Sequence, residues 1–536
     1  MFRKPKKKVC LVNLPRRPST IQEGPCLPLG LLQLAASLQR ISCPALILDF
    51  DLDFFVGQAS SEDDFLEKAV GRIGETGCGI IGISVASPTL PLALLLVRRL
   101  KSKIRDALVI LGGPGVFAVE RAILEVFPEV DIVVSGEGES TLPELIRVWI
   151  SRGDLASVAG LSFRRDGTVV TTSERTMIEN LDDLPFPLSE PSSLSEYLGY
   201  FGRREGLPYL PIEVGRGCPK LCAFCATSRF WGGRARQKSV RRILAEMKKA
   251  SRLGITDFLL LHDNMGAQPG FLPELCRNMA RVGTPYRWSC AVSADRIDPE
   301  EIGPMASSGC TTVLIGIESA SPKTQRAIGK RLDLAKADRI IKRCLEAGLQ
   351  TQVTFIIGFP EEDTEELALS LGQIFAYHRL GADVRIHLLD LLPGTPLWDR
   401  YLPKAVLAPA SDRVNSRWIQ TREEESLIFD HPEVFSSFRV PCPEDYVSEE
   451  ARGASIFYWT LFPSFTQPLC DVLQAVQAVG DGPLEVYRHW NAWRRRNYPD
   501  APITPDLVCA SFNDFLDSYS EDFYRRLKTL KPRPSN

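Results

Sequence analysis

The sequence predicts an α/β protein of three parts. These are an N-terminal Rossmann-like, doubly wound parallel sheet, a central partial (β/α)6 barrel of the TIM type, and a mostly helical C-terminal domain. Short apolar segments alternate with helical periodicity over residues 1–165 and again over 209–400. The chain has 536 residues, too many for one hydrophobic core. Beyond residue 400, tryptophans and tyrosines become frequent and helical stretches replace the alternation.

The composition is that of a globular protein without a strong charge bias. Apolar residues make up 44% of the chain, charged residues 24%, and the formal net charge is −2. So neutral a chain gives no reason to expect a nucleic-acid or membrane-surface partner. No apolar run approaches the roughly 20 residues of a membrane span. Without an export signal, we expect the 14 cysteines to lie in the cytoplasm, as thiols or metal ligands.

The N-terminal alternation predicts a sheet with a ligand edge. We expect strands at 9–12, 45–49, 80–84, 108–111 and 132–134, and helices at 29–40, 90–103 and from about 140. Ligands bind parallel sheets at the carboxyl ends of the strands, where Gly112-Gly113-Pro114 and Gly136-Glu137-Gly138 fall. Neither motif is a dinucleotide fingerprint or a P-loop, and the glycines alone are equally consistent with tight β–α turns.

The second alternation predicts the barrel. Prolines break any periodicity over residues 166–208, which we interpret as a linker. Six strands are then expected, at 212–214, 258–261, 288–291, 312–316, 351–357 and 384–389, with helices between them. Barrels of this type carry their chemistry at the C-terminal ends of the strands. The helical domain follows at 401–536, with helices expected at 465–478 and 484–496.

Three cysteines follow the first barrel strand in a C-x3-C-x2-C loop: Cys218, Cys222 and Cys225. Each iron of a [4Fe–4S] cluster needs one protein ligand, so three thiolates leave one iron open to another molecule. The alternatives are a structural zinc site or cysteines that are simply buried. Zinc needs four ligands, and the nearest other cysteines are Cys78 and Cys276. The spacing therefore favours a cluster.

With these motifs in order, residues 8–400 resemble the cobalamin-binding radical SAM family. The resemblance rests on the cysteine loop, on both N-terminal glycine motifs with Pro28-Leu29-Gly30-Leu31-Leu32, and on three later turns. Those turns are Gly316-Ile317-Glu318-Ser319, Ile357-Gly358-Phe359-Pro360-Glu361 and Leu392-Pro393-Gly394-Thr395-Pro396. The resemblance implies three cofactors: a [4Fe–4S] cluster, S-adenosylmethionine (SAM) and cobalamin.

The resemblance also assigns residues to each cofactor. It makes the three cysteines the cluster ligands and catalytic residues. SAM contacts are expected at Phe224, Asp263, Glu318, Ser319, Gly358 and Pro360. Cobalamin contacts are expected at Asn13, Pro15, Ser84, Gly112, Gly113, Gly136, Glu137 and Gly138. Asp263-Asn264 stands where many radical SAM enzymes have a glycine-rich pair. No histidine precedes His262, so the first domain offers no histidine as a lower ligand to cobalt.

The reaction implied by the resemblance is methylation of an unactivated carbon of a small molecule or natural-product intermediate. A non-methylating member of the family, performing cyclisation, rearrangement or another group transfer from SAM, is the alternative. A non-catalytic cofactor sensor or carrier is the alternative of another class. The expected partners are a small-molecule substrate and an electron donor such as flavodoxin or ferredoxin. The substrate itself cannot be predicted: Tyr458, Trp459 and His431 are candidates to line its pocket, but core packing explains each of them better.

Overall fold

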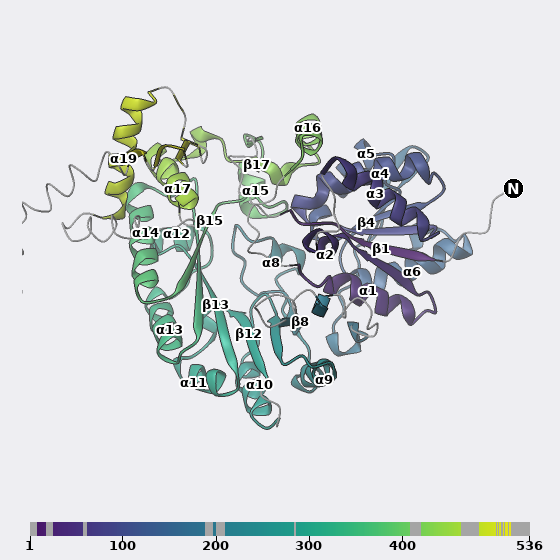
Figure 1. Cartoon of the computed structure of the whole chain (residues 1–536), viewed down its shortest axis with the longest axis horizontal. Helices are drawn as coiled ribbons and strands as arrows, with labels where there is room; N and C mark the ends of the chain where they lie inside the picture. The colour runs from purple at the N-terminus through teal and green to yellow at the C-terminus, as the bar shows by residue number, and fades with distance from the viewer. Residues whose placement is uncertain are drawn as a thin grey trace, which may run out of the picture.

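The structure is a computed structural model that describes most of the chain. The described residues are 8–17, 25–56, 62–187, 197–199, 209–282, 286–407, 420–461, 482–499 and scattered positions from 501 to 515. Figure 1 shows two α/β parts side by side, with C-terminal helices packed along the second. The predicted fold class is confirmed in both parts.

The first domain is built on a seven-stranded sheet in the order β2-β1-β3-β4-β5-β6-β7. Its parallel strands are β1 (Val9–Asn13), β2 (Ala45–Asp49), β3 (Ile80–Ser84), β4 (Leu108–Gly112) and β5 (Ile132–Val134). The antiparallel hairpin of β6 (Leu161–Arg165) and β7 (Thr168–Thr171) then extends the sheet. The order of the first five strands is a doubly wound one, whose switch point lies between β1 and β3.

Helices cover both faces of this sheet, as the buried apolar strands require. On one face lie α1 (Leu29–Gln39) and α6 (Gly138–Ser151), which pack against each other and the sheet. On the other lie α3 (Glu62–Glu75), α4 (Leu90–Lys103) and α5 (Glu120–Val126). Both α3 and α5 were absent from the sequence prediction, as was the short α2 (Phe50–Phe55).

The β6–β7 hairpin crosses the predicted end of the first domain. The boundary at residue 165 falls at its tip, so the sheet continues into the predicted linker. Asp166 and Gly167 form the tip with positive φ values of 49° and 78°. We therefore propose that the first domain ends after Thr171 rather than at residue 165. The limits of the other domains stay predictions.

The central part is a six-stranded parallel sheet in the order β15-β14-β13-β12-β11-β8, a partial barrel. Its strands are β8 (Tyr209–Glu213), β11 (Asp257–Leu261), β12 (Arg287–Val292), β13 (Cys310–Glu318), β14 (Gln350–Ile357) and β15 (Asp383–Leu388). The covering helices are α9 (Val240–Ser251), α10 (Phe271–Met279), α11 (Pro299–Ser307), α13 (Leu334–Glu346) and α14 (Thr364–Arg379). Each of the six expected strands is present, and Ser239 caps α9 by accepting a hydrogen bond from the Arg242 backbone N–H at 3.1 Å.

The C-terminal part is mainly helical in the residues that the structure describes. It contains α16 (Arg422–Asp430), α17 (Glu449–Leu461) and α19 (Pro483–Asn497), with a small hairpin of β16 (Val406–Leu407) and β17 (Arg439–Val440). Helix α19 matches the helix expected at 484–496, whereas the one expected at 465–478 lies outside the described residues. Helices α17 and α19 pack on α14 (Figure 1).

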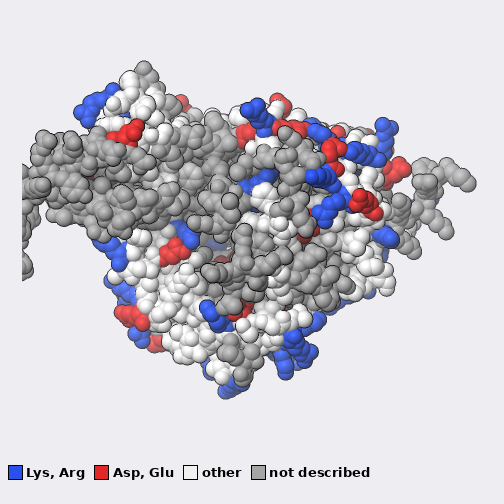
Figure 2. Space-filling view, viewed as in Figure 1, with Lys and Arg blue, Asp and Glu red and all other residues white. Residues whose placement is uncertain are grey.

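Helix α16 instead packs on α4 of the first domain, so the C-terminal part contacts both α/β parts. Figure 2 shows acidic and basic side chains interspersed over this region. One such contact joins Arg99 to Glu67 and Glu423, each at 3.3 Å. No helix in the described part of the chain is long and apolar enough to cross a membrane.

Candidate functional site

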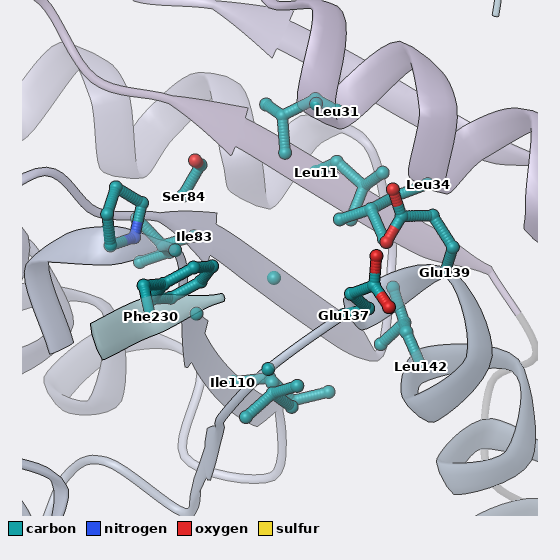
Figure 3. Close-up of a pocket in the computed structure, with 18 of the residues that line it drawn as sticks. Leu11, Leu31, Leu34, Ile83, Ser84, Ile110, Glu137, Glu139, Leu142 and Phe230 are labelled. Atoms are coloured by element: carbon teal, nitrogen blue, oxygen red, sulfur yellow. The ribbon is translucent and has the colours of Figure 1, made fainter. Parts of the chain in front are cut away.

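A cavity of about 260 Å³ lies at the carboxyl edge of the first domain's sheet. Leucine, isoleucine, valine and glycine residues form much of its lining. The apolar side chains are those of Leu11, Leu31, Leu34, Ile83, Ile110, Val134 and Leu142, and the glycines are Gly30, Gly82, Gly112, Gly113, Gly136 and Gly138. In Figure 3 Phe230, from the barrel part, lies at one end of this cavity, and Glu137 and Glu139 lie at the other. The cavity is therefore shared between the two α/β parts.

Six of the eight residues predicted to contact cobalamin line this cavity: Ser84, Gly112, Gly113, Gly136, Glu137 and Gly138. At Gly113 φ is 103°, and a Cβ would lie 2.7 Å from the Val85 carbonyl oxygen, so only glycine fits. Asn13 and Pro15 are not among the lining residues. The Asn13 amide instead donates to Asp49 Oδ1 at 2.8 Å, and Pro15 is buried.

Glu137 has a second role that the sequence did not reveal. It is 3% exposed, and its carboxylate accepts hydrogen bonds from Arg216 at 2.6 Å, from Arg236 at 2.9 Å and from the Ile178 backbone N–H at 2.6 Å. Burial alone would raise the pKa of Glu137, but these donors outweigh burial and lower it. The carboxylate is thus held ionised between the first domain and the barrel part.

Arg216 is the centre of this network. It is 5% exposed, lies directly before the cysteine loop, and also binds Glu213 at 2.7 Å and Glu139. Burial opposes its charge, but Glu139 and Glu213 more than compensate and raise its pKa. The guanidinium also lies over the ring of Trp231, 5.7 Å from the ring centre. Three carboxylates from both parts therefore meet at one cation.

A second cavity, of about 390 Å³, lies beside the first. The two share Gly30, Glu139, Glu213, Arg216 and Trp231, so together they follow the seam between the parts. The second cavity reaches the end of β11, where it is lined by His262 and Asp263. Burial lowers the pKa of His262 to about 4, and its Nδ1 accepts a hydrogen bond from the Asn264 backbone N–H at 2.9 Å. His262 is therefore neutral at pH 7.

The turn after β11 holds the cysteine loop in place. Asp263 Oδ2 accepts a hydrogen bond from the Gly217 backbone N–H at 2.6 Å, and Oδ1 accepts one from Thr227 at 3.4 Å. Gly217 has a φ of 92°, and a Cβ there would lie 1.9 Å from the Arg234 carbonyl oxygen. Asp263, predicted as a SAM contact, thus supports the loop, and a contact with SAM stays a prediction.

Asn264 approaches a cysteine directly. Its side-chain N–H2 donates to Cys218 Sγ at 3.8 Å, while its oxygen accepts from the Gly266 and Ser293 backbone N–H groups, each at 3.2 Å. Because two donors fix the oxygen, the amide nitrogen must face the sulfur. Burial raises the pKa of Cys222 to about 11, and nearby Lys330 partly opposes this.

The loop also packs into a small apolar core of its own. Ala223 and Phe224 contact this core, and the Phe224 and Phe359 rings lie 6.3 Å apart. The Ala223 backbone N–H donates to the Ile328 carbonyl at 2.8 Å. Phe359 belongs to the Gly358-Phe359-Pro360 turn after β14, so this turn and the cysteine loop lie together, and their contact with SAM stays a prediction. Gly358 has a φ of 82°.

A short helix connects the cysteine loop to the first cavity. Helix α8 (Ala226–Phe230) begins directly after Cys225, its N-cap, and spans 5 residues. Phe230 at its end lines the first cavity and contacts Phe117 of the first domain, with ring centres 5.6 Å apart. The cysteines and the sheet-edge cavity are thus neighbours in space, separated by little more than one helical turn.

Glu318 lies at an irregular position at the end of β13. Its φ is 67°, and the register with β14 shifts between Gly316 and Glu318. The carboxylate binds Lys330 Nζ at 2.7 Å, and a Cβ at Gly316 would lie 2.3 Å from Glu318 Oε1. Such strain in a non-glycine residue occurs mainly where a side chain must be aimed. The strain supports the expectation that Glu318 faces a ligand.

Ser319 is placed differently. It is fully buried, and its hydroxyl lies 3.1 Å from the Ser370 hydroxyl of α14 and accepts the Ser321 backbone N–H at 3.1 Å. These contacts give Ser319 a structural role in the strand end. A contact of Ser319 with SAM stays a prediction that these bonds do not favour.

Comparison with known protein families matches each of the two α/β parts to a family. Residues 22–146 match the B12 binding domain family and residues 212–372 match the radical SAM superfamily. An uncharacterized methyltransferase of Pyrococcus horikoshii is 29% identical over 396 residues, 73% of this chain and 82% of the relative. The cytidylyl-2-hydroxyethylphosphonate methyltransferase of Streptomyces wedmorensis is 28% identical, over 62% of this chain and 69% of the relative.

Other relatives carry out other reactions. An anaerobic magnesium-protoporphyrin IX monomethyl ester cyclase of Synechocystis is 24% identical, over 65% of this chain and 68% of the relative. Among solved structures, the radical SAM methyltransferase TsrM of Kitasatospora setae, with cobalamin and a [4Fe-4S] cluster bound, has a TM-score of 0.65. It is 19% identical, and the match covers 92% of this chain and 100% of TsrM.

The chain belongs to the cobalamin-binding radical SAM enzymes. Its cofactors are a [4Fe–4S] cluster, SAM and cobalamin, and the residues present fit each of them. Among the described residues, no three His, Cys, Asp or Glu side chains could hold a single metal ion. A four-iron cube carries its ligands at separate corners, so a set of three cysteines spread along one loop suits it.

The cobalamin side of this radical SAM enzyme also fits. The first cavity is largely apolar and lined by several glycines, which lets a large planar ring approach the backbone, and no histidine is among the residues that line it. For SAM, Glu318 and the Gly358 turn stand at the carboxyl ends of β13 and β14, on the same side of the barrel as the cysteine loop.

Several residues of this radical SAM site were missed by sequence reasoning. Arg216, Arg236 and Trp231 lie at the boundary between the two α/β parts, and Lys330 forms an ion pair with Glu318. Asp390 was also not singled out: it follows β15 at the carboxyl edge of the barrel strands, and burial raises its pKa to about 7. The one available signal was position, since Arg216 stands between a predicted strand and the cysteine loop. Its partners were invisible because Glu137 is 79 positions away in sequence.

Proposed function

We propose that the protein is a cobalamin-dependent radical SAM C-methyltransferase that acts on an unactivated carbon of a small molecule. The observation that carries the proposal is the continuity of the site. Helix α8 begins directly after Cys225 and ends with Phe230 in the apolar cavity, so one short helix links the cysteine loop to that cavity. Methyltransferases among its relatives support the reaction type.

Cluster and SAM, when bound, supply a radical that removes a substrate hydrogen atom, and cobalamin carries the methyl group. The chain's residues then have separate tasks. We propose that Cys218, Cys222 and Cys225 bind three irons of the cluster. Glu318, oriented by its ion pair with Lys330, would bind SAM together with the Gly358 turn. Phe224 would support that turn. The glycines at 112, 113, 136 and 138 let a flat ring approach the backbone.

The seam would exclude water from this chemistry. Trp231 lines both cavities, and Arg216 and Arg236 lie over its ring at 5.7 and 5.3 Å from the ring centre. Their charges are compensated by Glu137, Glu139 and Glu213, although Nε and one terminal nitrogen of Arg236 are buried without a hydrogen-bond partner.

The test is anaerobic reconstitution with iron, sulfide, cobalamin and SAM, followed by product analysis. We expect 5′-deoxyadenosine and S-adenosylhomocysteine together when the substrate is present. Replacement of all three loop cysteines by alanine should abolish both, whereas Cys442→Ala, outside the loop, should abolish neither. 5′-Deoxyadenosine without S-adenosylhomocysteine would favour a non-methylating reaction, such as that of the cyclase relatives. Retained cofactors without SAM cleavage would indicate a sensor or carrier.

We also propose that the protein works in a reducing cytoplasm with a one-electron donor. In the described part of the chain no cysteine forms a disulfide, which supports a reducing compartment. The cluster needs an external electron for each turnover that consumes the radical, which is why a flavodoxin- or ferredoxin-like donor is part of the proposal.

A further inference from the structure

The outer side of the cysteine loop carries an exposed leucine. Leu221 is 69% exposed, the largest value among the exposed large apolar residues that the structure describes, yet the next residue, Cys222, is 7% exposed. Two glycines flank it: a Cβ at Gly233 would lie 3.2 Å from Leu221 Cδ2, and one at Gly329 would lie 3.2 Å from its carbonyl oxygen. The leucine therefore stands on the surface directly above a proposed cluster ligand.

Two arginines without ion-pair partners belong to the turn whose Gly329 lies against the Leu221 backbone. Arg326 and Arg331 flank Gly329 in the chain, both are exposed, and neither has an ion pair within the described ranges. The Gly329 backbone N–H donates to the Arg326 carbonyl at 3.1 Å. Arg331 has a φ of 49°, a left-handed conformation that is unfavourable for arginine. This strained turn keeps two positive charges next to the leucine.

Other cations near the loop are compensated. Lys220 binds Asp295 at 2.8 Å, and Arg234 binds Glu179 at 2.8 Å. The charge at Arg326 and Arg331 is therefore local and unbalanced, although the whole chain is slightly acidic at −2. A single exposed leucine is common on protein surfaces, but arginine is enriched at protein interfaces, so the uncompensated charge near Leu221 is what favours a transient contact here.

We propose that Leu221, Arg326 and Arg331 form the docking surface for a small acidic electron-transfer protein, which we call the donor face. The inference rests on the proposed function, because only that function requires an electron. One electron leaves the reduced flavin or iron–sulfur centre of the donor and enters the cluster. The donor is oxidised by one electron, the cluster is reduced by one, and no bond or proton is transferred.

Charge and position both favour this occupant. Positive charge at a contact site steers an acidic partner and raises its association rate, an effect that salt weakens. The donor face is one peptide bond from Cys222, so a docked carrier would approach the cluster closely. Electron-transfer encounters also use small interfaces, which matches a surface of three residues and their neighbours.

The experiment compares two reductants on the reconstituted enzyme. Cluster reduction is followed by stopped-flow absorbance, with reduced flavodoxin in one arm and dithionite in the other. The test variant is R326E/R331E. The control is R241E/R252E, which makes the same charge change at two exposed arginines at the two ends of α9, outside the donor face. A second test variant, Leu221→Asn, removes the apolar contact without changing charge.

We expect R326E/R331E to be reduced by flavodoxin about tenfold more slowly at low salt, and the difference to shrink as salt is raised. L221N should also be slower, at all salt concentrations. Both should be reduced by dithionite at the wild-type rate, and R241E/R252E should match wild type in both arms. Wild-type rates with flavodoxin in the two test variants would overturn the donor face. So would an equal loss with both reductants, or failure of flavodoxin and an acidic ferredoxin to reduce the wild type.

The dithionite arm also separates this inference from the proposed function. If dithionite reduces the wild-type cluster but SAM is never cleaved, the proposed function fails whatever flavodoxin does. If dithionite supports SAM cleavage and charge reversal has no effect on flavodoxin, only the donor face fails.

Discussion

At the scale of single residues, the hydrogen bond from Asn264 to Cys218 is the contact most directly linked to the cluster. A donor to a ligand sulfur stabilises the reduced, more negative cluster and raises its reduction potential. Asn264→Asp keeps the oxygen that binds the Gly266 and Ser293 backbone N–H groups but replaces the donor with a second oxygen. We expect a lower midpoint potential at unchanged iron content.

The measurement is a redox titration followed by electron paramagnetic resonance. Asn278→Asp is a matched control, because Asn278 is a half-buried residue away from the cysteine loop whose amide donates to the Glu274 carbonyl at 2.9 Å. A potential for N264D that equals the wild-type value would show that the 3.8 Å contact has no electronic role.

A second residue-scale prediction concerns Glu362, whose carboxyl is buried near the Gly358 turn. Its Oε2 accepts the Gly358 backbone N–H at 3.3 Å, and burial raises its pKa to about 8. The folded protein therefore keeps this proton at neutral pH, while the unfolded chain loses it above its ordinary value of 4.5. Stability should fall as pH rises from about 4.5 to about 8, by at most about 1.4 kcal/mol per pH unit.

Glu362→Gln cannot ionise, so its stability should decline less over that window. Urea unfolding of wild type and E362Q at several pH values gives the comparison. The two free energies of unfolding should diverge as pH rises and become parallel above about pH 8. Parallel curves throughout would mean that Glu362 is ionised in the folded protein.

At the scale of elements, the cysteine loop depends on Gly217. A Cβ there would lie 1.9 Å from the Arg234 carbonyl oxygen, and φ is 92°. Gly254 shares the constraint on φ, at 83°, but has nothing within 4 Å of a Cβ. Gly254→Ala should therefore cost only the left-handed conformation, about 1–2 kcal/mol. Gly217→Ala should also displace the loop and lose most of the bound iron.

Iron and sulfide analysis after reconstitution distinguishes the two variants. Normal iron content in G217A would show that the loop has room to move away from Arg234. Loss of iron in both variants would point to backbone strain rather than to the clash.

Some of these helices and strands could be predicted from the sequence, and others could not. The barrel strands were predicted because each is a clear apolar run flanked by helical periodicity. Helix α3 was missed, since Gly71 and Gly74 interrupt a segment rich in acidic residues. The β6–β7 hairpin was missed although Asp166-Gly167 is a strong hairpin signal. The cysteines could be predicted because their ligand chemistry is local.

The seam could not be predicted in this way. Glu137 was interpreted as a cofactor contact from its glycine-rich surroundings, and it does line the cavity. Its pairing with Arg216 and Arg236 depends on how two separately folded parts meet. The local sequence around Glu137 or Arg216 does not specify how the two parts pack together. The contribution of these ion pairs to stability can therefore be assessed only for the whole molecule.

At that scale, Arg216 joins the cobalamin cavity to the cysteine loop. Arg216→Met would leave Glu139 and Glu213 without their guanidinium, and Glu137 would keep Arg236 and the Ile178 backbone N–H. Breaking a buried ion pair from one side costs about 3–5 kcal/mol. We therefore expect a large loss of unfolding free energy. We also expect cobalamin affinity to fall at least about tenfold, or 1.4 kcal/mol, because both cavities share this residue.

Arg234→Met is the matched control. Its partner is Glu179, and the two side chains are 56% and 60% exposed, so the pair should contribute less than about 1 kcal/mol. Urea unfolding and absorbance titration with cobalamin test both variants. If R216M binds cobalamin as wild type does, Arg216 is a structural link only. If R216M loses affinity while its cluster signal also changes, one guanidinium positions both cofactor sites.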